Sequence, residues 1–249
     1  MVAALRRVKP GWIVLLVAVV YAVVVTAVAR DARAEARELR LQLAVAAPPA
    51  AAAQEADDPE PPVARDGLWF PVPGAALPAD DAHLPGAPRP YRDGVSQGFA
   101  FYADDVGVPI VLGTPVVAAT DATVVRLDAA YREPTEAEWE ALLGAVADGA
   151  DEEQLDRLRG RQVWLEDAEG RIYRYAHLAS IEPDLRVGQR VARGQVIARA
   201  GNSGTDDGVQ GGRGGVRLHF EIWEDGAFLG DGLEPAAVRA EAAARFVGP

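Results

Sequence analysis

Near its N-terminus the chain has a 19-residue run without a charged residue, from Gly11 to Ala29. A transmembrane helix needs about 20 such residues, and in lipid a helix satisfies its own backbone hydrogen bonds. Residues 1–29 are therefore predicted to form a single-pass anchor in the cell membrane, with the short N-terminus inside and the C-terminal domain extracytoplasmic. The triplet Ala27–Ala29 resembles a signal-peptidase site, so a cleaved signal peptide is the alternative.

Residues 30–66 differ in composition from the apolar run before them and from the chain after them. Residues 30–46 mix helix-forming residues with charges of both signs, which predicts a solvated juxtamembrane helix. Residues 47–66 are rich in Ala, Pro, Asp and Glu, which is typical of a flexible linker. We expect this linker to hold a folded domain, residues 67–249, away from the membrane.

From Gly67 onward, short segments with β-forming residues alternate with Gly, Pro and Asp turns. The predicted strands are Gly98–Tyr102, Pro115–Ala119, Thr123–Leu127, Gln162–Glu166, Ile172–His177, Gln195–Ala198 and Leu218–Trp223. Two stretches resemble each other, "LGTPVVAATDATVV" from Leu112 and "VGQRVARGQVIA" from Val187. Together these patterns predict a mainly β domain, a compact antiparallel sheet or sandwich with duplicated units.

Residues 131–160 interrupt the strand pattern. Thr135 and Glu138 have the spacing of a capping box, and the apolar residues after them recur at helical spacing. A second short helix is predicted from Asp151 to Leu158. We interpret the segment as an inserted helical hairpin, which would serve as a structural cap, a lid beside a groove or a docking element for a partner.

Composition excludes several classes of site. The chain has no cysteine, so it has no disulfide, no thiolate metal site and no cysteine nucleophile. Its formal net charge is −12, which argues against nucleic acid as a partner.

The stretch "VRLHFEIW" from Val216 to Trp223 has the alternation of a strand. Val216, Leu218, Phe220 and Ile222 form its apolar face. The opposite face carries Arg217, His219, Glu221 and Trp223, and a histidine between an arginine and a glutamate is a candidate site residue.

Four segments resemble one known family in order and spacing: "GTPVVAATDATVV", "YRYAHL" from Tyr173, "VGQRVARGQVIARAGNSG" and "RLHFEI" from Arg217. The family is the lysostaphin-like, or LytM-type, zinc endopeptidases, which cut peptide cross-links of peptidoglycan. The resemblance covers about residues 68–233. It implies the LytM-type fold with its duplicated hybrid motif. It also implies zinc held by a His-x-x-x-Asp motif and by the second His of His-x-His, with two further histidines serving the catalytic water.

Mapped residue by residue, the resemblance implies a degenerate site. Ser96 and Ala100 stand where the family has the His and Asp ligands, and His219 keeps the third ligand position. Arg217 replaces the first His of His-x-His, and His177 keeps the other catalytic position. Catalytic zinc needs about three protein ligands, and Arg217 adds a charge that repels a dication. We therefore predict that the family zinc is absent. The predicted binding residues are His177, Arg217, His219, Tyr175 and Ser96.

The remaining candidates have simpler interpretations. His83 lies in a Pro-rich lead-in and is predicted to be a surface loop residue. The acidic residues Asp104, Asp105, Asp206 and Asp207 are predicted to be solvated in turns. Residues 201–215 are Gly-rich without the Gly-Lys-Ser/Thr ending of a phosphate loop, and they predict a mobile loop beside the groove. Ser203 lacks the Gly-x-Ser-x-Gly context of a serine hydrolase.

Three functions are compatible with these patterns. The first is a membrane-anchored, non-catalytic domain that binds peptidoglycan peptides or regulates a cell-wall hydrolase or division protein. The second is an active zinc endopeptidase with a relocated site. The third is a structural module that docks through residues 131–160. The "VGQRVARGQVIA" hairpin also resembles lipoyl-carrier barrels, but the only lysine is Lys9.

Overall fold

A computed structural model describes residues 67–247 of the chain. The predicted anchor, juxtamembrane helix and linker in residues 1–66 lie outside the described residues. Within 67–247, no helix is both long enough and apolar enough to cross a membrane. The described part is mainly β, with antiparallel sheets and few helices, as the sequence predicts.

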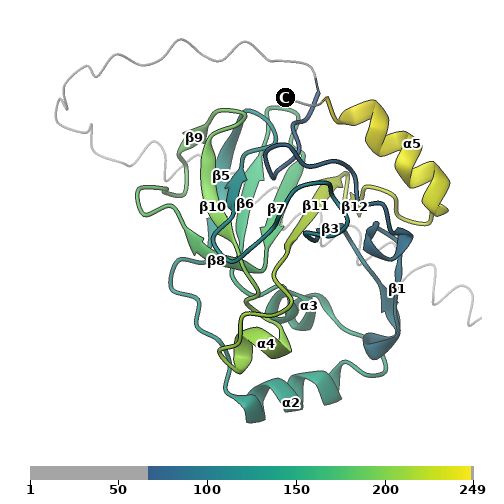
Figure 1. Cartoon of the computed structure of the whole chain (residues 1–249), viewed down its shortest axis with the longest axis vertical. Helices are drawn as coiled ribbons and strands as arrows, with labels where there is room; N and C mark the ends of the chain where they lie inside the picture. The colour runs from purple at the N-terminus through teal and green to yellow at the C-terminus, as the bar shows by residue number, and fades with distance from the viewer. Residues whose placement is uncertain (1–66, 248–249) are drawn as a thin grey trace, which may run out of the picture. The chain divides into compact units, whose positions relative to one another are not determined.

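The larger sheet has seven strands, with β12-β11-β7-β6-β5-β9 in order and β3 paired to β11 (Figure 1). Its strands are β3 (Phe99–Phe101), β5 (Ala122–Leu127), β6 (Val163–Glu166), β7 (Ile172–Ala176), β9 (Arg190–Val191), β11 (Leu218–Glu224) and β12 (Ala227–Phe228). All pairings are antiparallel. In the register of β11, His219 stands opposite Ala100 on one side and Ala176 on the other. The sheet therefore brings three segments that are far apart in sequence to one point.

The smaller sheet has the order β4-β10-β8, formed by β4 (Pro115–Val117), β10 (Val196–Ala200) and β8 (Leu178–Ile181). The two stretches that resemble each other in sequence pair with one another. Strand β4 pairs with β10 in this sheet, and β5 pairs with β9 in the larger one.

The core lies on the apolar side of β11 and β7. Leu218 and Phe220 are fully buried, as the alternation predicts, and Phe246 packs edge-on against Phe220. Phe246 follows helix α5 (Pro235–Arg245), which buries Val238 and Ala242 and runs along one side of the domain (Figure 1). The sequence analysis did not predict α5.

The inserted segment contains two helices, α2 (Glu136–Ala145) and α3 (Glu152–Leu158). Both begin with a complete capping box, from Thr135 and Asp151, so the predicted helices are confirmed. They share a small apolar cluster made of Trp139, Leu142, Val146 and Leu158. Figure 1 shows α2 and α3 beside the short helix α4 (Asp206–Val209), at one end of the sheets.

Residues 80–95 precede β3 with four short elements: η1 (Asp81–His83), β1 (Pro88–Arg89), η2 (Pro90–Arg92) and β2 (Gly94–Val95). The next glycine, Gly98, has no room for a side chain, because a Cβ there would lie 2.4 Å from the carbonyl oxygen of Phe220. Gly98, which lies between Ser96 and Ala100, therefore permits the close approach of β3 to β11.

Two predicted segments differ in detail. The strand predicted to end at His177 ends at Ala176, because His177 adopts a left-handed conformation with φ 59° and the chain re-enters the smaller sheet at Leu178. Residues 201–215, predicted to form a loop, contain α4, whose N-cap is the Thr205 hydroxyl.

Candidate functional site

A cavity of about 690 Å³ lies where β3, β11, the insertion and the 80–95 segment meet. It is lined by Ser96, Gln97, Ala100, Tyr102, Arg159, His177, Arg217, His219 and Glu221, by Trp139, Leu143, Leu155 and Leu158 from the insertion, by Gly204, Thr205, Asp206, Asp207 and Gly215 from the loop around α4, and by Ala82, His83, Arg89, Tyr91 and Arg92. A second hollow, beside Asp121 and Arg171, contains none of the predicted site residues.

Four of the five predicted binding residues line this cavity: Ser96, His177, Arg217 and His219. The prediction for Tyr175 is wrong. Its side chain is fully buried in the core, and its hydroxyl accepts a 2.9 Å hydrogen bond from the backbone N–H of Ala119. The cause is strand alternation, because Tyr175 pairs with core-facing Phe220 and points to the side opposite His219.

His177 is held at both ring nitrogens. Its Nδ1 lies 2.7 Å from the carbonyl oxygen of Ser203, and its Nε2 lies 2.8 Å from Nη2 of Arg217. The carbonyl can only accept and the guanidinium can only donate, so His177 is the neutral tautomer with its proton on Nδ1. Burial, helped by the charge of Arg217, holds the pKa of His177 well below its usual value.

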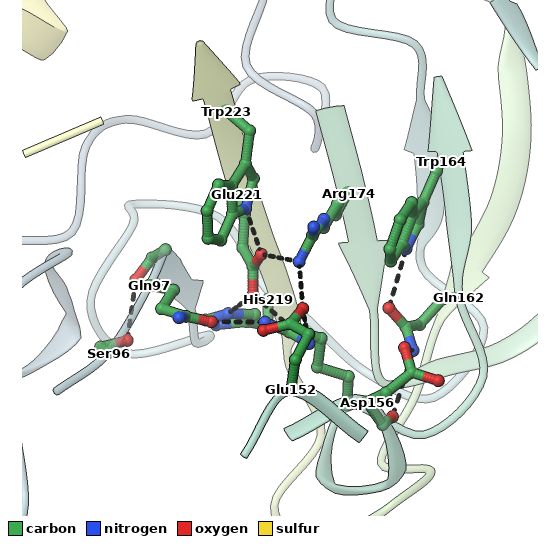
Figure 2. A network of polar contacts seen from close by, with 12 residues as sticks. Ser96, Gln97, Glu152, Asp156, Gln162, Trp164, Arg174, His219, Glu221 and Trp223 are labelled. Atoms are coloured by element: carbon green, nitrogen blue, oxygen red, sulfur yellow. Dashed lines mark hydrogen bonds and ion pairs between the residues drawn. The ribbon is translucent and has the colours of Figure 1, made fainter. Parts of the chain in front are cut away.

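His219 is bound to Glu221, two residues along the same strand (Figure 2). Its Nε2 lies 3.0 Å from Oε1 of Glu221, and because the carboxylate accepts, Nε2 carries the proton. Burial lowers the pKa of His219, although its hydrogen bond to Glu221 opposes that shift. The two imidazoles lie edge to face, with ring centroids 5.9 Å apart.

Glu221 lies on the polar face of the strand pattern, but its side chain is buried and the residue is only 1 % exposed. Its Oε1 also accepts a 2.7 Å bond from Nε of Arg159, and its Oε2 accepts bonds from Trp223 Nε1 at 2.6 Å and from Arg174 Nη1 at 3.3 Å (Figure 2). Burial alone would raise the pKa of this carboxyl, but the His219 hydrogen bond and the charge of Arg159 hold it well below its usual range.

The two arginines that neutralise Glu221 come from different elements. Arg159, 5 % exposed, follows α3 and also donates to Gln97 and to Glu152. Arg174, on β7, lies between the rings of Trp164 and Trp223, with its guanidinium carbon 4.0 Å and 4.3 Å from the ring centroids (Figure 2). This cation–π arrangement holds the charge in place at low solvent exposure.

The positions at which the resemblance implies zinc ligands do not fit that metal. Ala100 has no donor atom, and the Ser96 hydroxyl donates a 3.0 Å bond to the carbonyl oxygen of Gly98. His219 keeps one ring nitrogen, Nδ1, without a proton. Within residues 67–247, no three His, Asp or Glu side chains gather closely enough to hold a metal ion. The donor set at these positions therefore offers one good ligand where catalytic zinc needs about three.

The 80–95 segment contributes residues that the sequence analysis did not place at the site. His83, predicted to be a surface loop residue, lines the cavity and makes a 2.7 Å contact from Nδ1 to Oδ2 of Asp105. Arg89 and Arg92 line it as well. No sequence signal placed them there, because the lead-in precedes the Ser96–Ala100 motif without a pattern of its own and the fold brings it to the cavity.

The insertion forms an apolar part of the cavity wall and is fastened to the loop around α4. The indole Nε1 of Trp139 donates to Asp206, and the backbone N–H of Gly204 donates 3.0 Å to Glu133. Gly160 and Gly204 cross with their backbones in direct contact: a Cβ at Gly160 would lie 2.4 Å from the carbonyl of Ser203, and one at Gly204 would lie 2.6 Å from the Gly160 nitrogen.

A family model described as Peptidase family M23 matches residues 104–230. No curated protein matches the chain. Similar solved structures include a zinc-containing peptidase from Vibrio cholerae (22% identity, 66% of this chain and 39% of that chain, TM-score 0.40). Others are Csd3 from Helicobacter pylori (16%, 71% and 33%, 0.34) and the catalytic domain of lysostaphin from Staphylococcus simulans (18%, 62% and 85%, 0.37). The chain thus covers less than two fifths of the first two structures.

Proposed function

This chain belongs to peptidase family M23, and on that premise we propose that it is a non-catalytic member that binds peptide segments of peptidoglycan in the cavity beside His219. The observation that carries the proposal is the state of the residues at the family's site positions. Ala100 has no donor atom, His177 is bound at both nitrogens, and Nε2 of His219 is bound to Glu221.

In this proposal, the absence of zinc-dependent peptide hydrolysis follows from these contacts. Zinc in such a site lowers the pKa of its bound water and polarises the scissile carbonyl, which requires a fixed metal with an open position. A single imidazole nitrogen does not fix a metal, so the family zinc is absent in this proposal. A neutral His177 that already accepts from Arg217 has no lone pair left to take a proton from water.

The scaffold around the lost site supports binding. The cavity combines aromatic and aliphatic side chains with many polar and charged groups, which suits a peptide that carries groups of both kinds. The apolar run Gly11–Ala29 would place the domain outside the cell membrane, facing the wall.

The test uses the purified chain, insoluble peptidoglycan and a zinc measurement. The expected result is co-sedimentation of the chain with peptidoglycan, no release of soluble products, and zinc far below one per chain after dialysis against zinc. Stoichiometric zinc together with released products would contradict the proposal. Failure to sediment would contradict peptidoglycan binding and favour a protein partner such as a wall hydrolase.

A second candidate is an active endopeptidase with a relocated site, and the position of His83 favours it. This imidazole lies in the same cavity as His219 and is oriented by Asp105, as a ligand or general base often is. It predicts chelator-sensitive hydrolysis that is lost in His83→Gln and in His219→Ala. Hydrolysis that neither substitution changes would exclude it.

A further inference from the structure

Three arginines of the cavity have no acidic partner in the described part of the chain. Arg89 donates to the carbonyl oxygens of Pro88 and Ala82, and Arg92, 9 % exposed, donates to that of Val95. Arg217 donates to the carbonyl of Gly215 and to His177, and its guanidinium lies 5.8 Å from the ring centroid of Tyr102. Thus none of the three forms an ion pair within residues 67–247.

The three charges act on one another. The pKa of Arg89 is lowered by burial and also by the charges of Arg92 and Arg217. The pKa of Arg217 is lowered by burial, and only tyrosines oppose the shift. Gathering partly buried cations without a counter-charge costs free energy. Unpaired arginines are unexpected in a chain whose net charge is −12, because its acidic residues outnumber its basic ones.

The acidic residues that line the same cavity form no ion pair with these three arginines. Glu221 is neutralised by Arg159 and Arg174, and Asp206 accepts from the indole of Trp139. The carboxylate of Asp207 lies against the backbone of Gly214, where a Cβ would be 2.7 Å from it. The three guanidinium groups therefore keep donors from which no carboxylate of residues 67–247 accepts.

We propose that Arg89, Arg92 and Arg217 form a subsite for a carboxylate group of the bound peptide, while the insertion packs against its apolar side chains. Planar guanidinium groups match a carboxylate bidentately, and Trp139, Leu143 and Leu155 supply the apolar wall. The inference rests on the proposed peptide binding and adds the chemical class of the ligand. In this arrangement Arg217 has replaced a metal-assisting imidazole with an anion-binding group.

The experiment measures binding of soluble peptides released from digested peptidoglycan, and of the same peptides after their carboxylates have been converted to amides. The intact chain is immobilised and the binding isotherms are compared. We expect amidation to weaken binding by about tenfold or more, because charge-assisted hydrogen bonds are lost. Arg89→Gln and Arg217→Gln should weaken binding of the acid form and leave the amidated form nearly unchanged.

The matched control is Arg186→Gln, because Arg186 also donates to backbone carbonyls, those of Pro183 and Leu185, but lies outside the cavity. It should bind the acid peptides as the unmodified chain does. Equal binding of acid and amidated peptides would overturn the carboxylate subsite and leave peptide binding intact. Binding of neither form would overturn both proposals. The comparison of two ligands on the unmodified chain does not depend on the folding of any variant.

Discussion

The guanidinium of Arg217 donates to Nε2 of His177 across 2.8 Å, so two positions that the family uses for catalysis are here bonded to each other. Since His177 gives its only ring proton to Ser203, neither of its nitrogens is available for another partner. The substitution at Arg217 therefore does more than remove one imidazole. It also occupies Nε2 of the second imidazole, His177.

We predict that zinc binding can be restored by replacing the three degenerate positions together, with Ser96→His, Ala100→Asp and Arg217→His. The variant regains two ligands beside His219 and loses the opposing charge, so it should hold about one zinc per chain. Elemental analysis after dialysis measures this. Adding His219→Ala to the triple variant should abolish its zinc binding. Equal zinc in the unmodified chain would show that the present residues already hold the metal.

Glu221→Gln should destabilise the domain by about 3–5 kcal/mol, because it leaves the buried Arg159 with only the exposed Glu152 as a counter-charge. Urea unfolding of both proteins gives the difference. The control is Glu224→Gln on the same strand, whose side chain is 48% exposed and pairs with Arg245 at the surface. We expect Glu224→Gln to lower the free energy of unfolding by less than about 1 kcal/mol. Equal losses at the two positions would show that the ion pairs of Glu221 are not buried.

The free energy of unfolding should decrease as the pH falls from 7 towards 5. Folding lowers the pKa of His177 and of His219, so below about pH 6.5 the unfolded chain binds protons that the folded one does not. Each imidazole then contributes a slope of up to about 1.4 kcal/mol per pH unit. Urea titrations at several pH values measure the slope, and His177→Asn should reduce it. An unchanged slope in that variant would place the titrating groups elsewhere.

Gly98→Ala should cost about 2–3 kcal/mol, because the added methyl group would push β3 away from the Phe220 carbonyl. Gly144 offers the matched control. It lies within α2, and a Cβ there would meet nothing within 4 Å. Gly144→Ala should instead stabilise the protein by about 0.5–1 kcal/mol. Thermal or urea unfolding separates the two, and a neutral Gly98→Ala would mean that the strands can move apart at little cost.

Local patterns predicted the local structure well. Short β-rich segments between turn residues located the seven predicted strands, and the spacing of Thr135 and Glu138 predicted a capping box that the structure contains. The family resemblance carried by the motif strands is confirmed by the match to residues 104–230. Helix α5 was missed because its exposed surface is rich in alanine and charge, and only Val238 and Ala242 are buried.

The site was less predictable because its contacts join distant segments. The alternation of β11 places Glu221 on the same side as His219, but no pattern shows that Arg159 will cover it from the far end of the insertion. Arg89 and Arg92 belong to a Pro-rich lead-in without periodicity, so their arrival in the cavity depends on the fold alone. Tyr175 was misplaced because the motif was carried over as a unit, although its residues alternate between two faces.

The contact between the backbones of Gly160 and Gly204 limits how the shape of the cavity wall can change. Main chain touches main chain there, so the separation between the insertion and the α4 loop does not depend on any rotamer. Substitutions among the lining side chains can then change the polarity of the cavity wall, while the spacing between the insertion and the α4 loop stays fixed by contact between backbones.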